Sequence, residues 1–275
     1  MLRSLKQLEG FTVHALDGDI GTVHDFYFDD ERWGVRYLVA ETGEFWLEPS
    51  QVLISPLAFA PSDWESRLFQ VALTRDRVKG SPGPAAHQPI ARQFEREYFT
   101  YYGWPVYWGT EQLWGGWPTP GELFAQSPGA LVQDLALSDP HLRSLREVVG
   151  YHLQGTDGAL GQILDFIVDD RTWALRYLVI DTSNWWPGKY ILIPPEWVER
   201  FSGSEGQVHV NLPKEAIQNG PVWNPEGPIS RAFEVRLYDY YRRPAYWHED
   251  GQDDEASRTR EYLAGRLVKT PTAPD

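Results

Sequence analysis

Residues 17–39 read DGDIGTVHDFYFDDERWGVRYLV, and residues 157–179 read DGALGQILDFIVDDRTWALRYLV. The similarity is wider than this stretch, because residues 2–46 align without a gap on residues 142–186. A period near 140 residues has the size of a domain, whereas solenoid repeats have periods of about 20–50 residues. The sequence therefore indicates an internal duplication.

Each copy has the pattern of a small β unit. Apolar and aromatic runs alternate with turn signals such as Asp17-Gly18, a strong hairpin signal because glycine tolerates positive φ. Several short strands joined by tight turns favour a meander that curls into a small barrel. The expected strands are residues 11–16, 20–28, 33–40, 45–47, 52–54 and 69–74 in the first copy, and 151–154, 160–168, 173–180, 190–193 and 207–211 in the second.

An amphipathic helix is expected after each β unit. Ile90, Phe94 and Tyr98 are spaced four residues apart, and the second copy repeats this spacing with Ile229, Phe233 and Leu237. Such a stripe predicts one buried helix face, packed on its own barrel or on the other copy. The predicted fold class is therefore mainly β with some α: two tandem small barrels, each followed by a helix, related by a pseudo-twofold axis.

The predicted domain boundaries follow from the duplication. Residues 1–103 form the first unit, residues 104–141 a Trp-rich connector, residues 142–248 the second unit, and residues 249–275 an acidic tail. In the tail, Asp253-Asp254-Glu255 and then Tyr262 and Leu263 predict a short helix with acidic residues at its N-terminus.

The connector permits two interpretations. Its tryptophans either dock on a domain surface and fix the two units together, or form an exposed aromatic platform for a ligand or partner. The candidate interaction surface consists of Trp104, Trp108, Trp114, Trp117, Trp185 and Trp186.

Composition excludes several classes of function. The chain has no cysteine, which rules out disulfides, thiolate metal sites and a cysteine nucleophile. Its net charge is −14, with 10 basic against 19 acidic residues up to residue 140 and 15 against 20 after it, so neither half offers a basic nucleic-acid footprint. No apolar run has the length of a membrane span and no signal peptide opens the chain, so we expect a cytoplasmic protein.

For the acidic motifs we favour structural explanations over metal binding or catalysis. Asp17-Gly18-Asp19 resembles the start of a calcium loop, but Phe28 stands where an EF-hand needs its glutamate. The pairs Asp29-Asp30 and Asp169-Asp170 are candidate catalytic carboxylates, yet their position before a strand predicts solvated turns. In that case Asp30 and Asp170 pair with Arg36 and Arg176.

We expect residues that both copies share to serve the fold rather than a single active site. Asp25 and Asp165 lie between apolar strand residues, where each is expected to accept backbone hydrogen bonds and lock a bend. No histidine aligns with another histidine between the copies, so no catalytic residue, metal site or cofactor is predicted. The predicted fold-structural residues are Gly18, Gly21, Asp25, Trp33, Arg36, Gly158, Gly161, Asp165, Trp173 and Arg176.

The ordered motifs resemble those of the PRC-barrel domain family. They are a glycine after a Leu- or Val-containing start (Gly10, Gly150), Asp-Gly-x-x-Gly, Asp-Phe, an Asp-Asp turn and a Tyr-Leu-Val strand. The family includes the cytoplasmic domain of the photosynthetic reaction centre H subunit and the C-terminal domain of the ribosome maturation factor RimM. The resemblance covers about the first 55 residues of each copy and implies a small β-barrel used for protein–protein contact, with no common chemistry.

The function expected from the sequence is a non-enzymatic protein-interaction or scaffold module with a protein partner and no cofactor. Small-ligand or carbohydrate binding through exposed tryptophans is the alternative. A weaker alternative, implied by the resemblance, is an accessory role in reaction-centre assembly or electron transfer.

Overall fold

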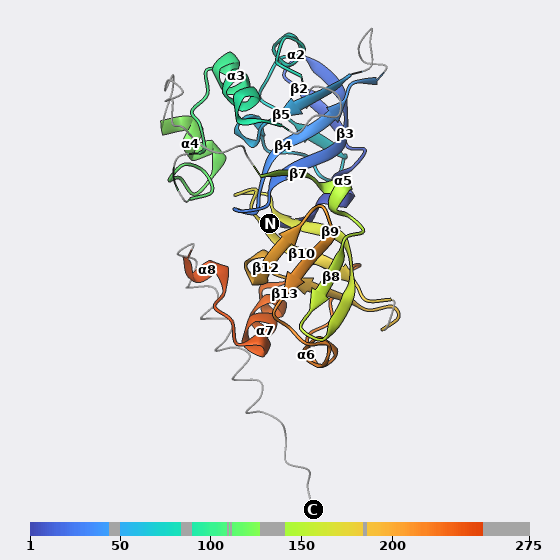
Figure 1. Cartoon of the computed structure of the whole chain (residues 1–275). Coiled ribbons are helices and arrows are strands. Elements are labelled where there is room, and N and C mark those ends of the chain that lie inside the picture. Colours follow the sequence, from blue (N-terminus) through green and yellow to red (C-terminus); the bar gives the residue numbers. More distant parts are fainter. Residues whose placement is uncertain are drawn as a thin grey trace, which may run out of the picture.

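The computed structural model describes residues 1–43, 50–83, 90–108, 110, 112–126, 141–183 and 186–249. We refer to residues 1–126 as the first half and to residues 141–249 as the second half. The predicted strand at residues 45–47, Trp185 and the predicted tail helix lie outside the described residues. The fold is mainly β with some helix, and its two sheets lie one above the other with the N-terminus between them (Figure 1).

The first half contains six strands and four short or medium helices among its described residues. The strands are β1 (Leu2–Ser4), β2 (Thr12–Ala15), β3 (Gly18–Asp29), β4 (Gly34–Glu41), β5 (Gln51–Ile54) and β6 (Leu68–Gln70). The helices are α1 (Leu5–Leu8), α2 (Arg75–Lys79), α3 (Arg92–Tyr102) and α4 (Pro120–Gln126), with a 3-10 turn η2 (Pro56–Ala58).

The second half follows the same order of elements with one additional strand, β12. Its strands are β7 (Leu142–Ser144), β8 (His152–Gly155), β9 (Gly158–Asp169), β10 (Leu175–Asp181), β11 (Tyr190–Ile193), β12 (Val198–Ser202) and β13 (Gln207–Val210). Its helices are α5 (Leu145–Val148), α6 (Lys214–Gln218), α7 (Arg231–Tyr241) and α8 (Tyr246–Glu249), with a 3-10 turn η3 (Pro195–Trp197).

Neither sheet closes into a barrel among the described residues, which corrects the prediction of two closed barrels. The strand order is β5-β4-β3-β2-β6 in one sheet and β11-β10-β9-β8-β13-β12 in the other. At the β5 edge, the Tyr98 hydroxyl of α3 donates to the Leu53 carbonyl at 2.9 Å and accepts from the Ser55 N–H at 3.2 Å. Pro56 follows and has no N–H to donate. The Tyr98 hydroxyl therefore caps two backbone groups at this edge.

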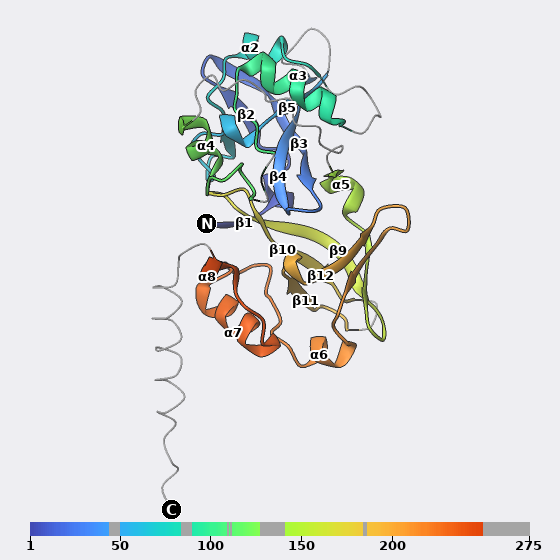
Figure 2. The same cartoon turned by 60° about the vertical axis from the view of Figure 1, so that its left-hand side comes forward.

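The two halves exchange their first strands, which the sequence did not predict. β1 pairs with β9 of the second half, with Ser4 opposite Ile167, and β7 pairs with β3 of the first half, with Ser144 opposite Tyr27. Both pairings are antiparallel. Figure 2 shows β1 lying beside β9 at the junction of the halves. Each sheet thus contains one strand from the other half, and reciprocal backbone hydrogen bonds join the two halves.

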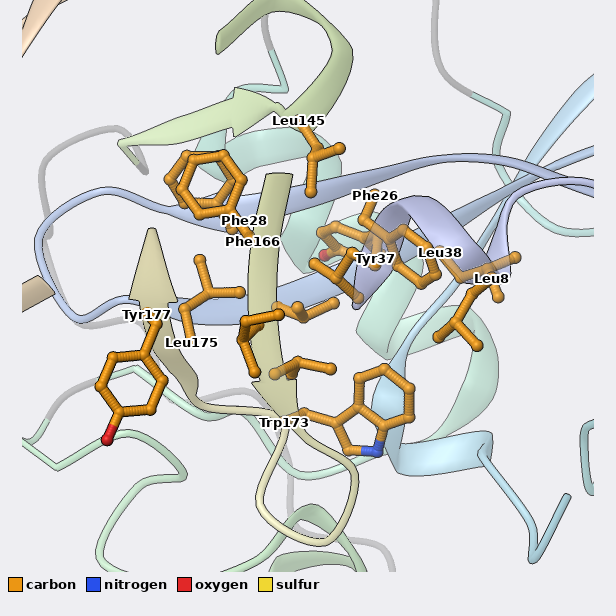
Figure 3. Close-up of a cluster of buried hydrophobic side chains, with 14 of the residues drawn as sticks. Leu8, Phe26, Phe28, Tyr37, Leu38, Leu145, Phe166, Trp173, Leu175 and Tyr177 are labelled. Atoms are coloured by element: carbon orange, nitrogen blue, oxygen red, sulfur yellow. The ribbon is translucent and has the colours of Figure 1, made fainter. Parts of the chain in front are cut away.

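A shared core forms where the halves meet. Phe28 and Phe166 have their ring centroids 5.1 Å apart, and Figure 3 shows the two rings together beside Leu145. Trp33 reaches Phe201 of the second half at 6.2 Å. In the opposite direction Trp173 reaches Phe59 of the first half at 4.6 Å. The equivalent aromatic residues therefore form one core that spans both halves.

Two equivalent glycines allow a close approach of strands. A Cβ on Gly21 would lie 2.1 Å from the Glu41 carbonyl oxygen, and one on Gly161 would lie 2.3 Å from that of Asp181. Gly161 also has a φ of +147°. A side chain at either position would push backbone against backbone, which explains why both copies have glycine there.

Candidate functional site

Asp25 and Asp165 fix the exchanged strands. The Asp25 carboxylate accepts the N–H of Phe26 at 2.7 Å, the N–H of Arg146 at 3.2 Å and the Ser144 hydroxyl. The Arg146 and Ser144 bonds cross from one half to the other. Burial raises the pKa of both aspartates, although these hydrogen bonds oppose the rise. The Asp165 carboxylate has the equivalent donors Phe166, Lys6 and Ser4.

Each carboxylate of the acidic pairs at the turns lies beside its own arginine. Arg36 binds Asp29 at 3.1 Å, whereas Asp30 is bound by Arg143 of the exchanged strand β7 at 2.8 Å. The predicted pairing of Arg36 with Asp30 is therefore corrected by one residue, since adjacent strand residues face opposite sides. In the second half the corresponding pairs are Arg176 with Asp169 at 3.8 Å and Arg3 with Asp170 at 2.6 Å.

The ion pair with Arg36 also affects the pKa of Asp29. Burial alone would raise the pKa of Asp29, but the Arg36 guanidinium and two backbone N–H groups outweigh burial and hold that pKa below its ordinary value. Asp29 is therefore a charged partner of Arg36 rather than a proton donor.

A buried glutamate lies at the centre of a polar group in each half. In the first half, one carboxylate oxygen of Glu95 accepts the hydroxyls of Tyr37 at 2.9 Å and Tyr107 at 2.7 Å, and the other binds Arg92. The Arg36 guanidinium lies over the Tyr107 ring at 3.8 Å. We call these five residues the first-half cluster. Burial raises the pKa of Glu95, and Arg92 and the two hydroxyls counteract that rise.

The second half repeats the arrangement. Glu234 accepts the hydroxyls of Tyr177 and Tyr246, both at 2.8 Å, and binds Arg231 at 3.0 Å. The Arg176 guanidinium lies over the Tyr246 ring at 3.9 Å. These five residues are the second-half cluster. Burial again raises the pKa of its glutamate.

Sequence reasoning did not single out either glutamate as a site residue. Both were visible as the last residue of the repeated motif Pro-Ile-x-Arg-x-Phe-Glu, which ends at Glu95 and Glu234. The sequence pattern did not show that either glutamate is buried, because each lies beside the apolar stripe of its helix, α3 or α7, and not within it. Arg36 and Arg176, predicted to serve the fold, do belong to these clusters.

The connector covers the first-half cluster. The Leu113 carbonyl accepts from Arg36 at 2.6 Å, and the Trp114 ring lies 5.0 Å from the same guanidinium. The Trp114 indole N–H donates to the Thr172 carbonyl of the second half at 2.6 Å. This short segment therefore closes one half and ties it to the other.

The predicted tryptophan surface is divided by burial. Trp104, Trp108 and Trp114 are at most 4% exposed, so their rings are not available to a partner in this structure. Trp117 is 36% exposed and Trp186 is half-buried. For these two residues the interaction surface stays a prediction.

The second-half cluster opens on a pocket of about 290 Å³. Three cluster residues, Arg231, Glu234 and Tyr246, line it, together with Asp169, the counterpart of Asp29. The remaining lining residues are Met1, Leu2, Arg171 and Ile229. We call this cavity the second-half pocket.

The described residues contain neither a candidate metal cluster nor a helix suited to crossing a membrane. Within them, no group of three or more His, Asp or Glu side chains is arranged to hold a metal ion. In the same part of the chain, no helix combines the length and the apolar character needed to cross a membrane.

Comparison with known proteins places one part of the chain. The model of the PRC-barrel domain matches residues 140–217, which run from β7 to α6, and does not support a second copy in the first half. No curated protein shows a significant match to the chain. Residues 140–217 of this protein are therefore similar to the PRC-barrel domain.

Proposed function

We propose that the protein is a non-enzymatic protein-interaction or scaffold module, built by tandem duplication of a PRC-barrel-like unit and working in the cytoplasm. The match at residues 140–217 supports the unit. The duplication is supported by the repeated sequence, by the shared order of strands, and by the equivalent contacts of Asp25 and Asp165 and of Glu95 and Glu234.

The observation that carries this proposal is that both halves contain the same cluster, which supports a structural role for it. Glu234 lines a pocket and has a raised pKa, which are also properties of a general acid. Yet Glu95 has the same tyrosine and arginine partners in the half where Leu113 and Trp114 cover the cluster. A cluster that is present even where the connector covers it is explained by a role in folding rather than in catalysis.

The connector offers the best candidate surface for a partner. Trp117 and Phe124 are 36% and 48% exposed, and both belong to the segment that has no counterpart in the repeat. Exposed aromatic side chains are enriched among residues that dominate protein–protein binding. Small-ligand stacking is less favoured, because three of the predicted tryptophans are buried.

Affinity capture with matched variants tests the proposal. We expect the full-length chain to retain a reproducible protein from its native cell extract, and Trp117→Ser with Phe124→Ser to lose it. Leu16→Ser is the control, since Leu16 is 72% exposed but lies in the β2–β3 turn. If no protein is retained specifically, or if Leu16→Ser removes it equally, the proposed surface is wrong. Turnover of any substrate that depends on Glu234 would contradict the non-enzymatic part.

A further inference from the structure

The second-half pocket has an apolar wall. Leu2 and Ile229 line it, and both side chains are half-buried. In the first half the equivalent of Ile229 is Ile90, which is only 6% exposed. The pocket volume of about 290 Å³ lies just below the range of about 300–1,000 Å³ that is usual for drug-sized ligands. The second half therefore offers an apolar contact to a small molecule at this place.

The carboxylate oxygens in the pocket lining are already engaged. In Glu234, Oε1 accepts two tyrosine hydroxyls, both at 2.8 Å, and Oε2 faces Arg231 at 3.0 Å. In Asp169, Oδ1 accepts the backbone N–H of Arg171 at 3.1 Å, and Oδ2 accepts the Thr172 hydroxyl at 3.2 Å. A basic ligand would have to compete with these donors, so the lining disfavours a cation.

Arg171 supplies a positive charge that no carboxylate matches. Among the other cations of the lining, the Met1 amine bonds Asp170 at 2.5 Å and Arg231 bonds Glu234. Arg171 is exposed, and within the described part of the chain no acidic side chain lies within ion-pair distance of its guanidinium. A guanidinium binds a carboxylate through two parallel hydrogen bonds. The unmatched charge therefore favours a monoanion.

The first half carries the opposite charge at this position. Arg171 and Glu31 are equivalent in the duplication, and each donates its backbone N–H to the aspartate two residues earlier, at 3.1 Å to Asp169 and at 3.0 Å to Asp29. The turn thus has the same backbone contact with either side chain. The fold does not require arginine at this position, which leaves its charge available to a ligand.

We propose that the second-half pocket binds a small organic carboxylate, with the carboxylate on Arg171 and an apolar body against Leu2 and Ile229. A doubly charged group such as a phosphate ester would exceed the single unmatched charge of the lining. This inference goes beyond the proposed function and does not rest on it, because a protein-interaction module also holds a small molecule without converting it.

A chemical-shift titration of the full chain tests the proposal. The probes are phenylacetate and hexanoate, each compared with its neutral amide, phenylacetamide or hexanamide, which has a similar shape without the charge. We expect saturable shifts of the backbone amides of Leu2, Arg171 and Ile229, and at least about tenfold tighter binding of a carboxylate than of its amide. The proposal is overturned if neither carboxylate gives saturable shifts at these amides, or if both bind no tighter than their amides.

Two variants with the same change of charge separate the pocket from general electrostatics. Arg171→Glu introduces the residue of the first half and should weaken carboxylate binding at least about tenfold, with amide signals outside the pocket at their wild-type positions. Arg200→Glu should leave the affinity within twofold, because Arg200 is exposed on β12 and does not line the pocket. Carboxylate binding that survives Arg171→Glu, or that Arg200→Glu weakens equally, also overturns the proposal.

Discussion

Replacing Asp25 by alanine should loosen the junction between the halves. The carboxylate accepts two backbone N–H groups and one hydroxyl, and Asp25 is 7% exposed. A hydrogen bond to a charged group contributes about 1.5–3 kcal/mol, and a buried donor left unpaired costs about 1–3 kcal/mol. The desolvation that raises the pKa of Asp25 offsets part of this. We therefore expect Asp25→Ala to lower the free energy of unfolding by about 2–4 kcal/mol.

Urea denaturation at pH 7, followed by tryptophan fluorescence, measures this loss. Asp165→Ala is an internal replicate and should cost a similar amount, because Asp165 has the equivalent donors. Asp25→Asn should cost less, since an amide oxygen still accepts. It also removes a titration: a folded pKa above the unfolded value makes stability fall as pH rises through that interval. The stability advantage of wild type over Asp25→Asn should therefore be larger at pH 4 than at pH 7.

A loss below about 0.5 kcal/mol, the size expected of an unremarkable surface substitution, would refute the assigned role of Asp25. So would a large loss in Asp25→Ala with none in Asp165→Ala. The double variant is informative as well, because a loss well beyond the sum of the two single losses would show that the exchanged strands open together.

Three other outcomes follow from the same contacts. Gly21→Ala should cost about 3 kcal/mol or more in urea denaturation, because its Cβ meets the Glu41 carbonyl, while Gly83→Ala, with open space around it, should stay within about 0.5 kcal/mol. Gly34→Ala should displace Leu113 and raise acrylamide quenching of tryptophan fluorescence, and Leu113→Ala added to it should restore the wild-type value. Glu95→Gln and Glu234→Gln should flatten the dependence of Tm on pH above the ordinary glutamate pKa of 4.5, where the raised pKa values make wild-type stability decrease.

The strands were predictable because short apolar runs and turn residues are local signals. The predicted run at residues 190–193 coincides with β11, and residues 207–211 contain β13. Asp25 was expected to accept backbone hydrogen bonds, and it accepts that of its neighbour Phe26. Local pattern was sufficient here, since each of these features depends on residues close together in the chain.

The exchange and the clusters were not predictable in the same way. Leu2–Ser4 is too short to show a period, and nothing in it specifies whether β1 pairs with its own copy or with the other. Glu95 is bonded by Tyr37 of β4 and Tyr107 of the connector, and the local pattern of its own helix shows neither contact. The capping of the Leu53 carbonyl and the Ser55 N–H by Tyr98 of α3 was equally invisible in the local pattern of β5.

The exchanged strands join the two halves of the chain. Each half supplies the other with a strand and with the donors for one buried aspartate, so the contacts are reciprocal, as in the isologous interface of a twofold dimer. Leu113 and Trp114 cover the cluster of the first half, whereas Arg171 lines the pocket of the second half at the position of Glu31. A specific function of this protein is therefore most reasonably sought where the two halves stop being equivalent.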